Sequence, residues 1–121
     1  MTAKARGDWG EEQVAAYLRE RGYRIVSSKY RCRFGEVDLI ARDGKTLCFV
    51  EVKMRSNLSF GLPREYVTAS KQNKLRTTAN YYLATHRTDA PCRFDVAEVY
   101  TDRGQTPENT RIEYIENAFS A

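Results

Sequence analysis

Three carboxylates and a lysine stand at alternating positions in a stretch that is otherwise largely apolar, residues 35–55. They are Glu36, Asp38, Glu51 and Lys53. Burying a charged side chain is costly unless it is paired or binds a metal. Carboxylates that share one face of a sheet suit a hard divalent cation with oxygen ligands, Mg²⁺ or Mn²⁺. A lysine beside such a cation can orient or deprotonate a water molecule, or neutralise charge that develops on a phosphate.

Two apolar runs on either side of residues 42–45 predict a β-hairpin, because the Asp-Gly pair between them supplies the positive φ angles of a tight turn. A turn centred on that pair sets Glu36 opposite Glu51 and Asp38 opposite Phe49. Asp38 and Glu51 then become diagonal neighbours on one face, about 7–8 Å apart at the backbone. The opposite face of this hairpin is predicted to be core and carries Val37, Leu39, Ala41, Cys48, Val50 and Val52.

An alternative interpretation is structural. Glu51 and Lys53 alone would be interpreted as an ordinary ion pair on a strand. The presence of Asp38 on the same face is what favours a metal site. Glu36 has two interpretations as well: it is a further carboxylate near the cation, or it points past the strand end into solvent. Because directly opposed carboxylates repel each other, we expect Glu36 to lie near the cation.

The rest of the chain predicts helices and further strands around the hairpin. Residues 7–21 carry apolar residues at helical spacing, with Asp8 and Glu11 in the pattern of a capping box and Gly22 as the terminating glycine. The other predicted elements are a strand at 24–29, a helix at 70–85, and strands at 93–100 and 112–115. Together they indicate a single α/β domain over residues 1–121, with a mixed sheet of about five strands flanked by helices. Asp95, on the predicted strand at 93–100, is expected to be structural and to pair with a nearby arginine.

Length and composition agree with one compact domain, since 121 residues with 41% hydrophobic content can bury a core. The sequence contains no apolar run of membrane-spanning length, and the N-terminus lacks the apolar segment of a signal peptide. The three cysteines are widely spaced and form no C-x-x-C pair, which favours reduced thiols. We therefore expect a cytoplasmic protein without a membrane partner.

Basic residues are concentrated around the hairpin and on the predicted second helix of a chain whose net charge is +4. Lysine and arginine that neutralise phosphates dominate affinity for nucleic acids, and aromatic side chains offer stacking surfaces for unpaired bases. The basic residues expected to contact nucleic acid are Arg31, Arg33, Arg55, Lys71 and Lys74. The aromatic residues interspersed among them are Tyr30, Phe34, Phe60 and Tyr66.

The order of motifs here resembles the core of the PD-(D/E)xK, restriction-endonuclease-like nucleases: an aspartate on a strand, then a short hairpin, then Glu-x-Lys. More closely, the chain resembles the YraN-like family of small bacterial proteins, which is similar to archaeal Holliday-junction resolvases mainly through this core. The resemblance extends over nearly the whole length in several ordered blocks. These are residues 10–11, 17–18, 22–25, 35–41, 49–55, 60–61, 71, 93–96 and 117–119.

The resemblance implies a restriction-endonuclease-like fold and a Mg²⁺- or Mn²⁺-dependent endonuclease acting on DNA, including branched recombination and repair intermediates. In resolvase-like nucleases a glutamate on the first helix contributes to the metal site. Glu11 is the matching position here, with Glu12 as the alternative, and a purely structural capping role for Glu11 remains open. A homodimer would suit a resolvase, which cuts two symmetry-related strands.

Two functional classes follow. In the first, Asp38, Glu51 and Glu11 serve a catalytic metal site together with Lys53, and Glu36 is a further ligand. In the second, the protein keeps the nuclease fold and binds nucleic acid without cutting it. A small-molecule enzyme is disfavoured, because the sequence has no glycine-rich phosphate loop, nucleophile elbow or cofactor motif.

Overall fold

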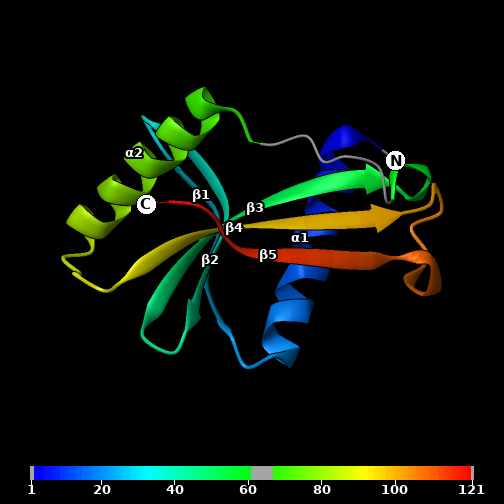
Figure 1. The fold of residues 1–121 in the computed structure, drawn as a ribbon, viewed down its shortest axis with the longest axis horizontal. Helices are drawn as coiled ribbons and strands as arrows, with labels where there is room; N and C mark the ends of the chain where they lie inside the picture. The colour runs from blue at the N-terminus through cyan, green and yellow to red at the C-terminus, as the bar shows by residue number, and fades with distance from the viewer. Residues whose placement is uncertain (1, 61–66, 121) are drawn as a thin grey trace.

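The computed structural model describes residues 2–60 and 67–120, which form a twisted five-stranded sheet with one helix on each face (Figure 1). The strands lie in the order β1-β2-β3-β4-β5, and every pairing is antiparallel except the parallel pair β3–β4. The α/β fold class is thus confirmed. The elements are α1 (Ala3–Glu20), β1 (Arg24–Cys32), β2 (Gly35–Asp43), β3 (Thr46–Ser56), a 3-10 turn (Asn57–Ser59), α2 (Ala69–Thr85), β4 (Cys92–Thr101), a second 3-10 turn (Pro107–Asn109) and β5 (Arg111–Phe119).

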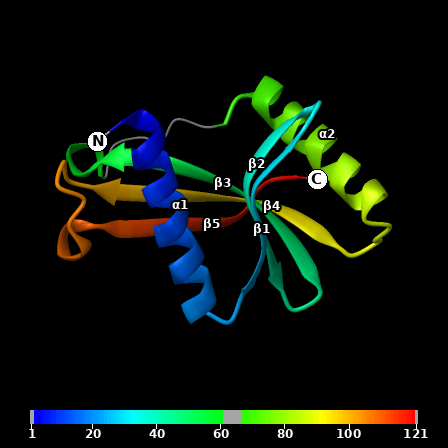
Figure 2. The ribbon, with the colours of Figure 1, turned by 180° about the vertical axis from the view of Figure 1, so that it is seen from behind.

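Each helix covers its own hydrophobic core. Figure 2, seen from behind, has α1 crossing the sheet in front, whereas Figure 1 has α2 in front at the other end. On the α1 face, Val14 and Leu18 pack against Cys48, Val50 and neighbouring strand residues. The α2 face buries Leu75, Ala79 and Tyr82 against a separate set of strand residues, Ile40, Leu47, Phe49, Phe94 and Val96. The C-terminal half of β3 extends beyond the cover of α2 (Figure 1).

Helix α1 begins four residues earlier than its pattern predicts, and its N-cap differs. Thr2 is the N-cap, and its side chain accepts a hydrogen bond from the Ala5 amide at 3.0 Å. The predicted capping box of Asp8 and Glu11 is therefore wrong, since both lie inside the helix. The predicted end of the helix is confirmed: Gly22 has φ +87°, and the Tyr23 amide donates to the Leu18 carbonyl at 3.0 Å.

The predicted hairpin exists, but its register is shifted by two residues. Asp43 pairs with Thr46 and Ile40 with Phe49, so the turn is centred on Gly44 and Lys45. Placing Glu36 opposite Glu51 was wrong, because Glu36 pairs with Arg31 of β1 instead. A shift of two residues preserves the face of every side chain, since side chains alternate with period two.

One member of the predicted core face lies on the other side of the sheet. Val37 packs in the α2 core, whereas Leu39 and Ala41 pack in the α1 core as expected. The alternation is broken between Val37 and Leu39, at the position of Asp38. This break accompanies the end of the β2–β3 ladder, which stops at the pair Leu39–Val50.

The later elements agree with the sequence in type and differ in length. Helix α2 begins one residue before the prediction, at Ala69, and its N-cap Thr68 accepts a hydrogen bond from the Lys71 amide at 3.2 Å. Strands β1 and β5 are longer than predicted, and β5 continues to Phe119, whose ring stacks on Phe94 in the α2 core. No helix in the described ranges is long and apolar enough to cross a membrane.

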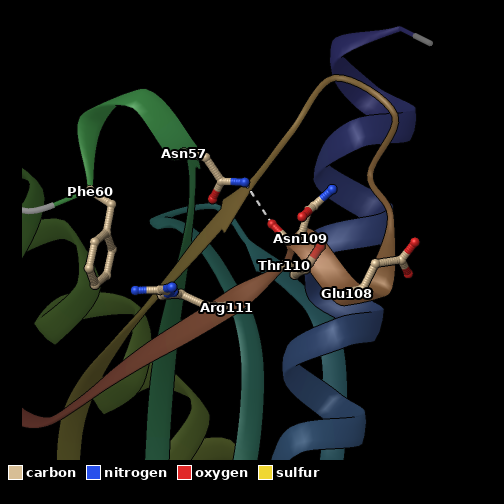
Figure 3. Close-up of a pocket in the computed structure, with 6 residues that line it drawn as sticks. All are labelled: Asn57, Phe60, Glu108, Asn109, Thr110 and Arg111. Atoms are coloured by element: carbon tan, nitrogen blue, oxygen red, sulfur yellow. Dashed lines mark hydrogen bonds between the residues drawn. The ribbon is translucent and has the colours of Figure 1, made fainter.

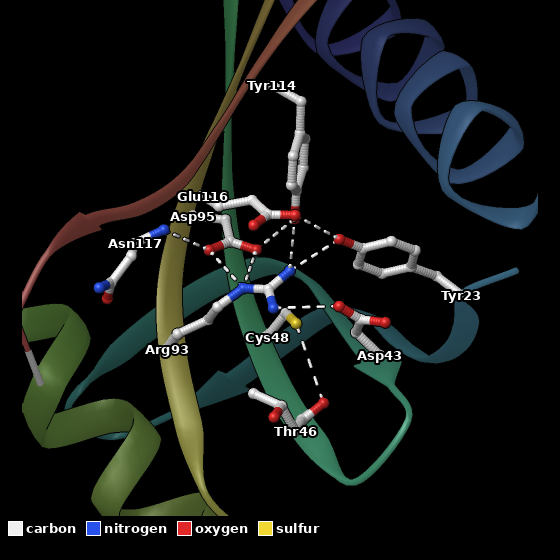
Figure 4. A network of polar contacts seen from close by, with 9 residues as sticks. All are labelled: Tyr23, Asp43, Thr46, Cys48, Arg93, Asp95, Tyr114, Glu116 and Asn117. Atoms are coloured by element: carbon white, nitrogen blue, oxygen red, sulfur yellow. Dashed lines mark hydrogen bonds and ion pairs between the residues drawn. The ribbon is translucent and has the colours of Figure 1, made fainter. Parts of the chain in front are cut away.

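The structural role expected for Asp95 is confirmed by a network on the α1 face (Figure 4). Asp95 is completely buried, and both its oxygens lie 3.1 Å from Arg93 Nε. The Tyr114 hydroxyl donates to the same carboxylate at 2.5 Å. Arg93 also contacts Asp43 at 3.1 Å and the Tyr23 hydroxyl at 2.7 Å, so one guanidinium joins β4, the hairpin end and the segment after α1. Burial raises the pKa of Tyr23 to about 12.

Candidate metal and nucleic-acid site

A hollow of about 270 Å³ opens on the α2 face between β2, β3 and the start of α2. Asp38 and Glu51 both line it, which confirms that they share a face of the sheet. Besides these two carboxylates, the lining residues are Gly35, Glu36, Lys71, Lys74 and Leu75. Three acidic and two basic side chains therefore meet at one place, although they come from three different elements.

The end of the β2–β3 ladder positions Asp38. Asp38 and Glu51 are the next residues beyond the last paired positions, Leu39 and Val50. Past this point the Val52 amide donates a hydrogen bond of 2.8 Å to Asp38 Oδ2. The side chain of Asp38 thus supplies the acceptor that the backbone of β2 no longer offers, and its carboxylate is fixed against β3 next to Glu51.

The electrostatic environment of Asp38 is unfavourable for a negative charge. Burial and, after it, the charge of Glu51 raise the pKa of Asp38 to about 7, and Glu11 contributes in the same direction. The hydrogen bond from Val52 and the charge of Lys71 oppose these effects without cancelling them. Carboxyl groups with raised pKa values that share a site are typical of catalytic and metal-binding positions.

Glu51 forms an ion pair, whereas Asp38 forms none with any residue in the described ranges. The Glu51 side chain is only 9% exposed and pairs with the ammonium of Lys71, whose own side chain is 48% exposed. Because Lys71 lies in the first turn of α2, the start of this helix places the Lys71 ammonium next to the Glu51 carboxylate on β3. Lys74, one turn further on, lines the same hollow and is exposed.

Glu11 of α1 does not line this hollow: it lines a separate one of about 320 Å³ on the α1 face together with Glu12 and Lys29. Lys29 of β1 lies 2.6 Å from Glu11 and 2.5 Å from Asp8. The backbone of Lys29 has φ +54°, a conformation that residues other than glycine seldom adopt. The pattern of hydrophobic residues in the sequence does not reveal such a conformation. The charge of Glu11 still reaches Asp38, whereas Glu12 is exposed.

The remaining predicted residues lie around the hollow. Glu36 at its rim is paired with Arg31 at 3.2 Å, and Arg33 is exposed in the turn between β1 and β2. Lys53 follows Glu51 by two positions on β3, is half-buried and does not line the hollow. Arg55 is directed to β4, where its Nε lies 3.0 Å from the buried carboxylate of Glu98. Of the predicted DNA-contact residues, Lys71 and Lys74 line the hollow with Asp38 and Glu51, and Arg31 pairs with Glu36 at its rim.

Another hollow of about 380 Å³ lies at the far end of β3 and is lined by Asn57, Phe60, Glu108, Asn109, Thr110 and Arg111 (Figure 3). The guanidinium of Arg111 lies 4.0 Å from the centre of the Phe60 ring, and Asn57 Nδ2 donates to the Asn109 carbonyl at 2.7 Å. This hollow shares no lining residue with the one that holds Asp38 and Glu51.

The potential ligand set for a metal is small. Among residues 2–60 and 67–120, no three histidine, cysteine, aspartate or glutamate side chains are grouped so that they could hold an ion. Two carboxylates are nevertheless a sufficient protein contribution for Mg²⁺, which keeps several water ligands and commonly takes the rest from substrate phosphates. Asp38 and Glu51 fit that requirement, because a cation between them would compensate both the burial of the Asp38 charge and its repulsion by Glu51, the two effects that raise the pKa of Asp38.

Comparison with known proteins places the chain in a family. The model of the uncharacterised protein family UPF0102 matches residues 10–99. A UPF0102 protein of Syntrophus aciditrophicus is 49% identical over 98% of this chain and 92% of its own length. UPF0102 proteins of Nitrosomonas europaea and Lachnoclostridium phytofermentans are 45% and 42% identical, over 98% and 100% of this chain and 96% and 98% of their own lengths.

The five-stranded mixed sheet with one helix on each face is a small α/β fold, consistent with the restriction-endonuclease-like class. The chain belongs to family UPF0102, the YraN-like family, as its sequence motifs indicate. The matched residues include β2, β3, α2 and most of β4, and so contain Asp38, Glu51 and Lys71.

Proposed function

We propose that this protein is a metal-dependent endonuclease that hydrolyses phosphodiester bonds in DNA, including branched recombination and repair intermediates. The observation that carries the proposal is the pairing of Asp38 and Glu51 in one hollow together with Lys71 and Lys74. Carboxylates would repel a phosphate unless a cation lay between them and the DNA. Lysines at the rim of the same hollow would attract it.

Asp38 and Glu51 would hold one Mg²⁺ or Mn²⁺. The cation would provide Lewis-acid stabilisation of the charge on the phosphate and on the attacking water. Glu11 and Glu36 are the next carboxylates available to the site, each now held by a basic residue, Lys29 and Arg31. Their direct participation would require those ion pairs to open.

The lysines divide the remaining work. Lys71 pairs with Glu51. Once Glu51 coordinates a metal ion, we expect the Lys71 ammonium to leave Glu51 and to pair with a phosphate oxygen of the DNA. Lys53 is two positions further along β3, where it would orient the attacking water or neutralise charge on the phosphate. The attacking water loses a proton to solvent as its oxygen forms a bond to phosphorus, the bond from phosphorus to one sugar oxygen breaks, and that oxygen takes up a proton.

A second candidate function is binding to structured nucleic acid without cleavage. It is favoured by the ion pair between Lys71 and Glu51, which neutralises one of the two central carboxylates without any metal. In that case the acidic residues would be part of a structural ion-pair cluster, and divalent cations would not alter binding.

A cleavage assay separates the two functions. Purified protein is incubated with linear duplex, flap, single-stranded and four-way-junction DNA, with Mg²⁺, Mn²⁺ or EDTA. The variant Glu51→Gln is compared with Glu20→Gln, which changes an exposed glutamate at the end of α1. We expect metal-dependent cleavage by wild type and Glu20→Gln, and none by Glu51→Gln. Equal junction binding in EDTA and Mg²⁺ without cleavage of any substrate would instead support the binding function.

A further inference from the structure

An exposed aromatic side chain borders the hollow that holds Asp38 and Glu51. Phe34 is 38% exposed and lies in the turn between β1 and β2, directly before Gly35, which lines that hollow. Phe34 itself lines an adjoining open depression of about 620 Å³ together with Ser70, Asn73, Lys74 and Thr77 of α2. Lys74 lines both hollows, so the depression adjoins the carboxylate site.

The position of Phe34 is fixed by its backbone. Gly35 has φ +152°, and a Cβ added there would lie 2.9 Å from Thr78 Oγ1 of α2. The turn therefore approaches the helix so closely that only glycine fits without a shift. Phe34 is held next to this contact, and its ring meets Tyr81 edge-on with the centroids 5.5 Å apart.

The surroundings of Phe34 are cationic. The guanidinium of Arg33 lies 4.8 Å from the centre of the ring, and Lys74 borders the same depression. The other aromatic residues considered from the sequence are placed differently. Tyr30 packs edge-on against the buried Tyr82, Phe60 lies in the separate hollow of Figure 3, and Tyr66 lies outside the described residues.

We propose that Phe34 is a stacking platform for an unpaired base, on a nucleic-acid strand whose phosphates pass Lys74 and Lys71 toward Asp38 and Glu51. This inference rests on the proposed function in that it names the substrate class of the same site. A base inside a duplex has both faces covered by its neighbours, so a side chain can stack on it only by unstacking the duplex, whereas an unpaired base offers a free face. The substrate class is therefore DNA with an unpaired nucleotide beside the phosphate that enters the site, such as a flap.

Binding measured without cleavage tests the platform. Fluorescence anisotropy in EDTA compares a fully paired duplex with the same duplex carrying a single-stranded flap. Stacking on an aromatic side chain contributes enough that Phe34→Ala should weaken flap binding by about 5- to 150-fold. Duplex binding should change by less than about twofold, because phosphate contacts dominate it. Phe34→Trp should retain flap binding.

Val26→Ala is the matched control, since Val26 is equally exposed at 38% but lies on β1 away from both hollows. It should leave both affinities unchanged. A flap that lacks its bases should bind wild type as weakly as the intact flap binds Phe34→Ala. This arm decides the matter even if Phe34→Ala does not fold.

The proposal is overturned if Phe34→Ala weakens flap and duplex equally, or if removing the bases from the flap has no effect. Because EDTA prevents hydrolysis, the result is independent of the nuclease proposal. Base-dependent flap binding by a protein that never cleaves DNA would support the platform and contradict the nuclease. Cleavage by a protein whose DNA affinity does not depend on the bases of the flap would support the nuclease and contradict the platform.

Discussion

Replacing Asp38 with asparagine should make the protein more stable above neutral pH. The substitution is nearly isosteric, and the asparagine oxygen can accept the same hydrogen bond from the Val52 amide. It removes a charge that burial and Glu51 disfavour. The pKa of Asp38 is about 7 in place of 3.8, and each pKa unit corresponds to about 1.4 kcal/mol. This gives an upper limit of about 4 kcal/mol, and since Asp38 and Glu51 titrate together we expect about 1–3 kcal/mol.

The effect has a defined pH dependence. At pH below about 4 the carboxyl is protonated in the folded and the unfolded chain, so wild type and Asp38→Asn should be equally stable. Between about pH 4 and 7 the unfolded chain has released the proton while the folded chain retains it. The free energy of unfolding of wild type therefore falls as the pH rises through this window, and above it the whole difference is present.

Thermal and urea unfolding in EDTA at several pH values measure this difference. At pH 8 we expect the Tm of Asp38→Asn to exceed that of wild type by about 3–10 °C. Asp89→Asn, at an exposed aspartate, is the control and should not change the Tm. Millimolar Mg²⁺ should stabilise wild type and not Asp38→Asn. A variant less stable than wild type at pH 8, or a difference independent of pH, would refute the reasoning.

Three further substitutions test individual contacts. Lys53→Ala should abolish cleavage and leave DNA affinity within about threefold, since one charge among several phosphate contacts carries a small share of binding; equal loss of both in cleavage and anisotropy assays would make it a DNA-contact residue. Lys71→Met leaves the Glu51 carboxylate without its lysine partner and should lower the free energy of unfolding in EDTA by about 1–3 kcal/mol. Mg²⁺ should restore part of this loss in urea titrations, and no recovery would argue against a metal ion at Glu51. Asp95→Asn breaks the buried pair with Arg93 and should cost about 3 kcal/mol in the same titrations, and a change below about 1 kcal/mol would contradict its structural role.

Sequence patterns predicted the hairpin because local turn chemistry and alternation carry that information. They also predicted the shared face of Asp38 and Glu51, which survives a register shift of two residues. The register itself depends on which two residues occupy the turn, and Asp-Gly-Lys offers two adjacent choices. The place of Val37 was missed because β2 leaves β3 at Asp38, a tertiary event with no local signature.

Contacts between distant elements were the least predictable part of the site. Lys71 was recognised as basic, but its ion pair with Glu51 depends on where α2 packs on the sheet. Lys29 was recognised only as one of the basic residues before the hairpin, because its contacts with Asp8 and Glu11 follow from the docking of α1 and from a positive φ angle. The capping-box pattern at Asp8 also occurs inside a helix, where Thr2 had already provided the cap.

The binding of a divalent cation by Asp38 and Glu51 is tested most directly by a crystal structure of the protein soaked in Mn²⁺ at pH 8. An anomalous difference map should show one Mn²⁺ about 2 Å from an oxygen of each carboxylate, with the Lys71 ammonium moved away from Glu51. A map with no peak in this hollow, or with Mn²⁺ held elsewhere while Lys71 still pairs with Glu51, would contradict the metal site and the nuclease activity built on it.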